Sequence, residues 1–134
     1  MCSSDLPNHG AALACYTRFV QPRRAGPKPV CSTHALAECY ATLTVLPLTR
    51  RIQPAEAARL IEANFLEHLE VLPLSAADYK AAIARVSSLG LPSGAIYDAL
   101  HVRCAERAGC DRILTYNTAD FTRLTPPGIE VATP

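Results

Sequence analysis

The sequence has little net charge and few aromatic residues. Tryptophan is absent, aromatic residues make up 6% of the chain, and the 134 residues carry a formal net charge of +1. A chain so close to neutral does not hold a nucleic acid by bulk attraction, although a local basic strip is compatible with it. Binding of a polyanion must therefore come from the geometry of particular side chains.

Two common site signatures are also missing. The six cysteines, at positions 2, 15, 31, 39, 104 and 110, form no C-x-x-C pair. Neither a zinc site nor a disulfide framework is indicated, and reduced, mostly buried thiols are expected. No strand candidate is followed by G-x-G-x-x-G or G-x-x-x-x-G-K-[ST], which argues against a nucleotide-binding doubly wound domain.

Long apolar runs are missing too. None approaches the roughly 18 residues of a membrane span, and no signal peptide is recognised. We therefore expect a cytoplasmic protein that makes no contact with a membrane.

The residues that are present favour one α/β domain over residues 1–134. Hydrophobic residues account for 49% of the chain, enough for a core at this length. Strand candidates alternate with helical segments and lie at roughly 29–31, 69–72, 112–116 and 129–132. This alternation predicts a three-layer α/β/α domain with a mainly parallel central sheet, whose ligands gather outside the carboxyl ends of the strands.

Capping signals mark the starts of the helices. Ser32 or Thr33 can cap the helix after the first strand, and Ser93 can cap the helix from Ala95 to Ala108. Ser75 and Asp78 form a near capping box, and the helix dipole stabilises an aspartate in this place. Asp78 therefore fits a structural role, and we assign it no function.

Three other acidic residues stand at the edges of regular structure. Glu38 and Asp98 lie on helix faces made mostly of small or apolar side chains, where an unpartnered carboxylate is costly. Asp120 follows the strand at 112–116, in the first turn of the next element. A tertiary fold can bring the three carboxylates together.

Clustered carboxylates point to a hard cation. Like charges at close range raise each other's pKa values. A divalent ion that prefers oxygen ligands, Mg²⁺ or Mn²⁺, resolves this repulsion. Such a metal can orient a water and neutralise charge on a phosphodiester during in-line attack.

Three stretches of the sequence carry a family resemblance. They are YDALH at 97–101, RILTYNTADF at 112–121 and STHALAECY at 32–40. The first two resemble the C-terminal half of PIN-domain ribonucleases, particularly toxins of the VapC type, and the third is similar to the family's second acidic motif. The resemblance covers nearly the whole chain from about Pro7 onward.

The resemblance implies a metal-dependent endoribonuclease. Glu38, Asp98 and Asp120 match the second, third and fourth acidic positions, which bind Mg²⁺ or Mn²⁺ for RNA cleavage. Thr115 and Asn117 match polar positions that line the same site, and we interpret Asn117 as hydrogen-bonding a carboxylate or a metal-bound water. The resemblance also implies an RNA substrate, a cognate antitoxin that supplies a side chain to the acidic pocket, and a homodimer.

Ordinary structural roles compete with these assignments. Glu38 taken alone is a common kind of helix residue, Asn117 is a natural turn residue, and Thr115 is an ordinary strand residue. The three acidic residues together favour function.

One part of the family pattern is missing from the sequence. The family opens with a hydrophobic strand that ends in an aspartate, whereas only Met1 to Ser4 precede Asp5 here. We therefore expect an N-terminal strand that is missing or shortened, with weakened activity. The competing interpretation is a catalytically weak PIN-like domain that acts as an RNA- or protein-binding module.

Overall fold

A computed structural model describes residues 29–133 of the protein. The helix expected from about Asn8 to Val20, Asp5 and the shortened first strand lie outside the described residues. The described elements are β1 (Val30–Ser32), α2 (Thr33–Val45), α3 (Pro54–Ile61), the π-helical turn η1 (Glu62–Leu66), β2 (Glu70–Leu72), α4 (Ala76–Ser88), α5 (Ala95–Arg107), β3 (Arg112–Leu114), α6 (Thr118–Leu124) and β4 (Glu130–Ala132).

The four strands form two parallel pairs. In one, Cys31 of β1 lies opposite Val71 of β2; in the other, Ile113 of β3 lies opposite Val131 of β4. The α/β class and the parallel pairing predicted from the sequence are confirmed. The expected central sheet is present as two separate two-stranded sheets among residues 29–133, and α5 contacts both β1 and β3.

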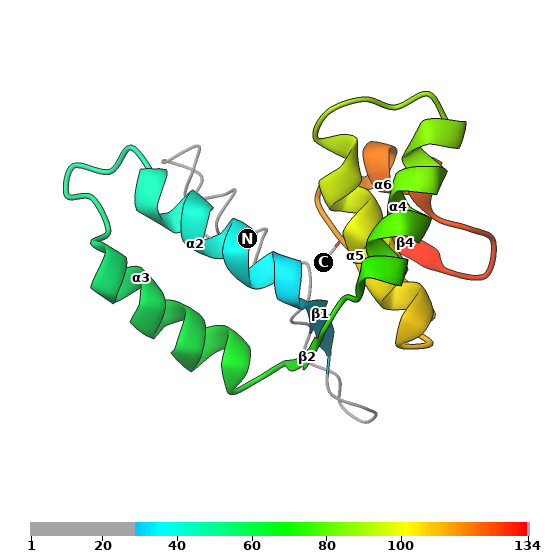
Figure 1. The fold of residues 1–134 in the computed structure, drawn as a ribbon. Coiled ribbons are helices and arrows are strands. Elements are labelled where there is room, and N and C mark those ends of the chain that lie inside the picture. Colours follow the sequence, from blue (N-terminus) through cyan, green and yellow to red (C-terminus); the bar gives the residue numbers. More distant parts are fainter. Residues whose placement is uncertain (1–28, 134) are drawn as a thin grey trace.

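The helices lie in two groups around the strands (Figure 1). Helices α2 and α3 pack against each other on one side of β1 and β2. Helices α4, α5 and α6 pack together on the other side, with α5 in the middle because it contacts both α4 and α6. Helix α5 also contacts α2, so it connects the two groups.

Side-chain capping marks the starts of two of the described helices, α2 and α4. The Ser32 side chain accepts a hydrogen bond from the Ala35 amide at the start of α2, and Ser75 and Asp78 form the full capping box of α4. The prediction for Ser93 was wrong. Its φ of 55° places it in the left-handed region, within the turn before α5, and Gly94 precedes α5 without a side-chain cap.

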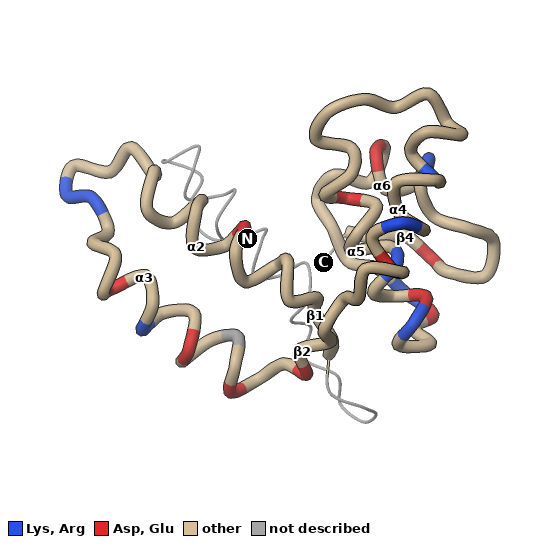
Figure 2. Tube along the Cα trace, viewed as in Figure 1, with Lys and Arg blue, Asp and Glu red and all other residues tan. Residues whose placement is uncertain are grey.

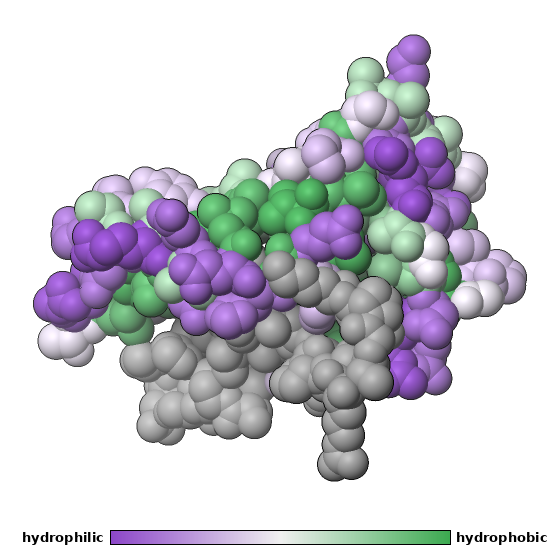
Figure 3. All heavy atoms as spheres, turned by 90° about the horizontal axis from the view of Figure 1, so that it is seen from below, coloured by the Kyte–Doolittle hydropathy of each residue, from purple (hydrophilic) through white to green (hydrophobic). Residues whose placement is uncertain are grey.

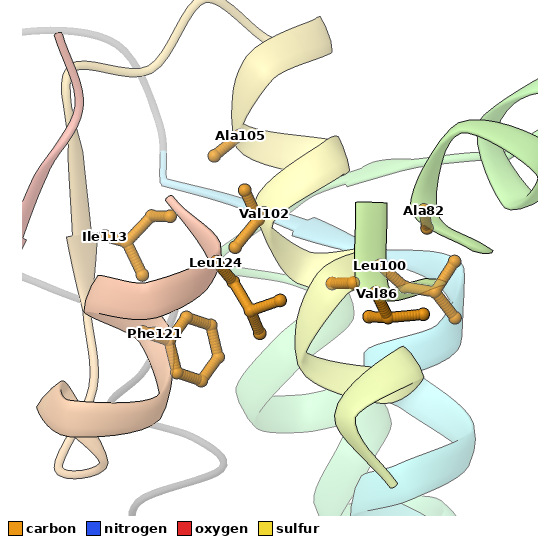
Figure 4. Close-up of a cluster of buried hydrophobic side chains, with 9 residues drawn as sticks. Ala82, Val86, Leu100, Val102, Ala105, Ile113, Phe121 and Leu124 are labelled. Atoms are coloured by element: carbon orange, nitrogen blue, oxygen red, sulfur yellow. The ribbon is translucent and has the colours of Figure 1, made fainter. Parts of the chain in front are cut away.

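The larger hydrophobic core lies around α5 (Figure 4). It joins α4, α5, β3 and α6 through Ala82, Val86, Ala99, Leu100, Val102, Ala105, Ile113, Phe121 and Leu124. A smaller cluster, built partly from small side chains, joins α2 to α3 and β1: Cys31, Ala35, Cys39, Ile61 and Leu69. Buried apolar area is therefore concentrated around α5, and this packing holds α4 and α6 against it.

The cysteines in the described region are buried or partly buried, as expected. Cys31, Cys39 and Cys104 are buried and Cys110 is partly buried. Burial, followed by the neighbouring thiols of Cys31 and Cys110, raises the pKa of Cys104 to about 12. Such a thiol is inert as a nucleophile. The other two cysteines lie outside the described residues.

Hydrophobic residues gather toward the middle of one face of the molecule, with hydrophilic residues toward its two ends (Figure 3). The large hydrophobic side chains that remain exposed include Val45 on α2, Leu60 on α3 and Ile83 on α4. Within residues 29–133, every helix is too short or too polar to span a bilayer.

Candidate functional site

Glu38 reaches from α2 toward α5. Its Oε2 atom lies 2.6 Å from Nε2 of His101, and its Oε1 atom lies 3.4 Å from Nε2 of His34. Glu38 is the only charged residue of α2, which is otherwise uncharged along its length (Figure 2). Its side chain keeps 25% of its surface exposed, whereas the His101 side chain keeps 1%.

His101 occupies the interior between β1, α2 and α6. Its Nδ1 atom lies 3.4 Å from Oγ of the buried Ser32, and its ring stacks on Phe121 with centroids 6.4 Å apart. His101 is therefore an interior side chain, with 2% of the residue exposed. Its hydrogen bond to Glu38 is an addition from the tertiary structure.

Asp98 lies one turn before His101 on α5 and is partly buried. Its neighbour Tyr97 stacks on His34, with centroids 5.0 Å apart and 10° between the ring planes. Tyr97 remains 49% exposed. The start of α5 therefore borders on the same two histidines that face Glu38.

Asp120 lies in the first turn of α6 and is held by two neighbours. The Asn117 side-chain amide donates a hydrogen bond to Oδ2 at 2.7 Å, and the Arg123 guanidinium donates one to Oδ1 at 2.6 Å. The hydrogen bond from Asn117, followed by that from Arg123, lowers the pKa of Asp120. The next residue, Phe121, is the one that packs on His101.

Thr115 shapes the turn that carries Asn117. Its buried Oγ1 accepts a hydrogen bond from the Asn117 backbone amide at 3.0 Å. Its own amide donates to the Ala132 carbonyl at 2.9 Å, which continues the pairing of β3 with β4 by one residue. Thr115 therefore joins the end of the strand to the start of α6.

The three acidic residues thus come from three helices whose surfaces meet at His101. Glu38 hydrogen-bonds the ring, Asp98 precedes it by one turn of the same helix, and Asp120 precedes the phenyl ring that stacks on it. The larger core holds α5 against α6. The positions of Asp98 and Phe121 on these two helices are therefore fixed relative to each other.

The donor chemistry of these side chains suits a divalent ion, since Mg²⁺ and Mn²⁺ prefer carboxylate oxygen. Their arrangement does not complete a metal site in this structure. Among residues 29–133, no three histidine, cysteine, aspartate or glutamate side chains are placed to hold a metal ion together. Glu38 and Asp120 instead contact protein groups, namely imidazoles, an amide and a guanidinium.

The roles of His34, Ser32 and His101 in this region were not predicted from the sequence. His34 stands four positions before Glu38 on the same helix, a spacing that places the two side chains on one face. That signal was available in the sequence. Ser32 and His101 are 69 positions apart, and only the packing of α5 on β1 brings them together.

A further buried acid, Asp78, lies away from this region, between α4 and α5. Its carboxylate accepts hydrogen bonds from Arg103 Nε at 2.9 Å, from Arg107 Nη1 at 2.6 Å, and from the amide and hydroxyl of Ser75. The hydrogen bond from the Ser75 backbone amide, together with those from the two guanidinium groups, holds the pKa of Asp78 well below its ordinary value. The structural role predicted for Asp78 is confirmed, and the two arginines extend it.

Comparison with known proteins identifies the family of this chain. Residues 5–125 match the PIN domain. Ribonuclease VapC27 of Mycobacterium tuberculosis (strain ATCC 25618 / H37Rv) is 39% identical over 67 residues, which are 50% of this chain and 47% of that protein. The chain thus matches about half the length of this curated relative. Since the domain match covers most of the sequence, the chain belongs to the PIN domain family.

Proposed function

We propose that this chain is a metal-dependent endoribonuclease that cleaves RNA phosphodiester bonds, and that it acts in the cytoplasm as the toxin of a toxin–antitoxin pair. The observation that supports the proposal is the hydrogen bond between Glu38 and the buried His101, a ring that lies one turn from Asp98 on α5 and stacks on Phe121, the neighbour of Asp120. A chain of the PIN domain family with partial identity to a protein named as a ribonuclease supports this choice.

Each residue has a stated role in the proposal. Glu38, Asp98 and Asp120 would hold the divalent ion, and Mg²⁺ or Mn²⁺ would supply charge neutralisation at the scissile phosphate and activation of a water. Asn117 orients the Asp120 carboxylate through its amide, and Thr115 holds the turn that presents Asn117. Both act by limiting the freedom of groups that must be accurately placed.

The proposed protein partners follow from the same features. The contact between Asp120 and Arg123 indicates that a basic side chain is accommodated beside this acid, which suits an antitoxin that inserts one. Large exposed hydrophobic side chains, such as Val45 and Ile83, are compatible with a homodimer. Light scattering of the purified chain, alone and with its antitoxin, tests both assemblies.

RNA cleavage with and without a divalent ion tests the function. We expect wild-type protein to cut RNA in Mn²⁺ or Mg²⁺ and to stop cutting when a chelator removes the ion. Asp98→Asn should lower the rate by about 100-fold or more, since loss of an outer partner alone costs about 10- to 100-fold. Glu62→Gln, an exposed acid on η1, is the control and should cut like wild type. Cleavage that persists in Asp98→Asn contradicts the assignment.

The absence of a completed metal group among residues 29–133 favours a second candidate, a catalytically weak RNA- or protein-binding module. Under this alternative, Mn²⁺ does not raise the melting temperature, and the protein binds RNA without cutting it. Stabilisation by millimolar Mn²⁺ that disappears in Asp98→Asn favours the nuclease instead, because a ligand stabilises the state that binds it.

A further inference from the structure

His101 is the point where the three candidate elements meet, although it is almost completely buried. Only 2% of the residue is exposed, with Phe121 on one side and the His34 ring 6.1 Å away. A buried imidazole is costly unless both nitrogens find partners. The partners of its two ring nitrogens therefore indicate the role of His101.

The Nδ1 side of the ring faces the start of α2. Ser32 is the N-cap of that helix, and its Oγ accepts a hydrogen bond from the Ala35 amide at 3.2 Å. The hydroxyl hydrogen remains available to the Nδ1 atom of His101 at 3.4 Å. The capping residue thus also anchors the ring.

The Nε2 side faces the Glu38 carboxylate at 2.6 Å. An ionised carboxylate only accepts hydrogen bonds, so Nε2 carries the hydrogen and donates it. A hydrogen bond to an ionised acceptor is shorter and stronger than one between neutral groups. The 2.6 Å distance agrees with such a bond. In a neutral ring with this hydrogen on Nε2, Nδ1 is the acceptor for Ser32, so a single tautomer satisfies both contacts.

This chain of contacts limits the freedom of Glu38. A glutamate on a helix surface ordinarily samples several rotamers, because three side-chain torsions are free. Here Oε2 is fixed by a ring that is itself held by Ser32 and Phe121, while 25% of the side chain stays exposed. One carboxylate oxygen is therefore fixed on an interior group, and the side chain still reaches the surface.

We infer that His101 is a positioning residue for RNA cleavage: through Nε2–H it holds the Glu38 carboxylate in the orientation that the reaction uses. The inference rests on the proposed function. Catalytic groups must be held within about 0.5 Å, and buried hydrogen-bonding partners supply this precision. Loss of such a partner costs about 10- to 100-fold in activity.

Two substitutions of His101 separate its two hydrogen bonds. In His101→Gln, the terminal amide reaches the position of Nε2 and can still donate to Glu38. In His101→Asn, the shorter amide reaches only the position of Nδ1 and Ser32. Both variants lose the buried ring, so they share the packing cost and serve as matched controls for each other.

We expect His101→Asn to lower kcat by about 10- to 100-fold with little change in KM, and His101→Gln to stay within about threefold of wild type. Nitrogen NMR of the wild type should show a neutral His101 protonated at Nε2 and not at Nδ1. Circular dichroism establishes that both variants are folded before their rates are compared.

Equal losses in both folded variants, or a ring protonated at Nδ1 alone, overturn the inference. If both variants unfold, the wild-type tautomer decides. A wild type that cuts no RNA in any divalent ion overturns the proposed function and the positioning role with it. That failure is recognised because the hydrogen bond to Glu38 remains visible by NMR while cleavage is absent.

Discussion

Helix α5 receives a carboxylate from each of two neighbouring helices, and the two contacts differ. Asp78 of α4 meets Arg103 and Arg107, whereas Glu38 of α2 meets His101. Asp78 is 2% exposed, and the Glu38 side chain is 25% exposed. The Asp78 carboxylate thus joins α4 to α5 in the interior, whereas the Glu38 carboxylate reaches the surface.

The difference lies in how many acceptor sites are filled and by what. An ionised carboxylate offers about four lone-pair positions. Asp78 has hydrogen bonds from two guanidinium groups, the Ser75 amide and the Ser75 hydroxyl, which match that number. Arginine is always charged, so this partnership is permanent. An acid in such surroundings has little left to offer a substrate or a metal.

The largest expected effect comes from the acid that reaches the surface. Glu38→Gln keeps an oxygen that can accept from His101 but removes the negative charge, so the fold should persist. We expect RNA cleavage to fall by about 100-fold or more, since a direct ligand should matter at least as much as its supporting partner. Single-turnover cleavage in Mn²⁺ measures it, and melting curves establish that the variant is folded. Cleavage at the wild-type rate would remove Glu38 from the site.

Asp78→Asn should give the opposite pattern. The substitution leaves Arg103 and Arg107 without a counter-charge at the junction of α4 and α5, which breaks a buried network. We expect the melting temperature to fall by roughly 10 °C. The folded protein, assayed well below that temperature, should cut RNA like wild type. A large drop in kcat without a drop in stability would place Asp78 in the functional site.

Local signals in the sequence predicted most of the fold. The four strands lie within a residue or two of the expected segments, and the Ser75–Asp78 capping box forms as its spacing indicated. Ser93 shows where local reasoning fails, because a serine before a helix is a good cap only with extended backbone, and here φ is 55°. That torsion depends on the turn that connects α4 to α5.

The candidate site could be predicted only in part. Asp98 stood out because it lies on a helix face of small and apolar side chains, and Asp120 because it follows a strand. The hydrogen bond from Asn117 to Asp120 agrees with the turn chemistry of the sequence. The partners of Glu38 and Asp78 could not be predicted, since His101 and Arg103 come from a helix far along the chain. Such pairs depend on which faces of the helices pack together, which one sequence does not encode locally.

A smaller effect should appear in acid. The folded pKa of Asp78 is depressed, so its contribution to stability is present above the ordinary aspartate pKa and is lost as the pH falls through that value toward the folded one. The free energy of unfolding of the wild type, measured with urea, should therefore decrease steadily as the pH falls below about 4. In Asp78→Asn, this part of the slope should be missing. Parallel curves for the two proteins would show that Asp78 is not the group responsible.

The smallest effect concerns Arg123. Asp120 pairs with this arginine, as Asp78 pairs with two arginines, but the Arg123–Asp120 pair is exposed to solvent. The Arg123 and Asp120 side chains are 59% and 45% exposed, and pairs of this kind contribute little to stability. Arg123→Gln should therefore leave the melting temperature unchanged within about 1 °C.

The charge on Asp120 gives the more sensitive measurement of that contact. The hydrogen bond from Asn117 is the largest single cause that lowers the pKa of Asp120, and Arg123 lowers it both by a hydrogen bond and by its charge. Carbon NMR titration should accordingly show a rise of this pKa in both Arg123→Gln and Asn117→Ala, and the sizes of the two rises rank the two partners. The sign follows because each substitution removes a group that favours the ionised carboxylate. If Arg123→Gln gives the larger rise, the guanidinium is the dominant partner, and Asp120 then resembles Asp78 more closely than Glu38.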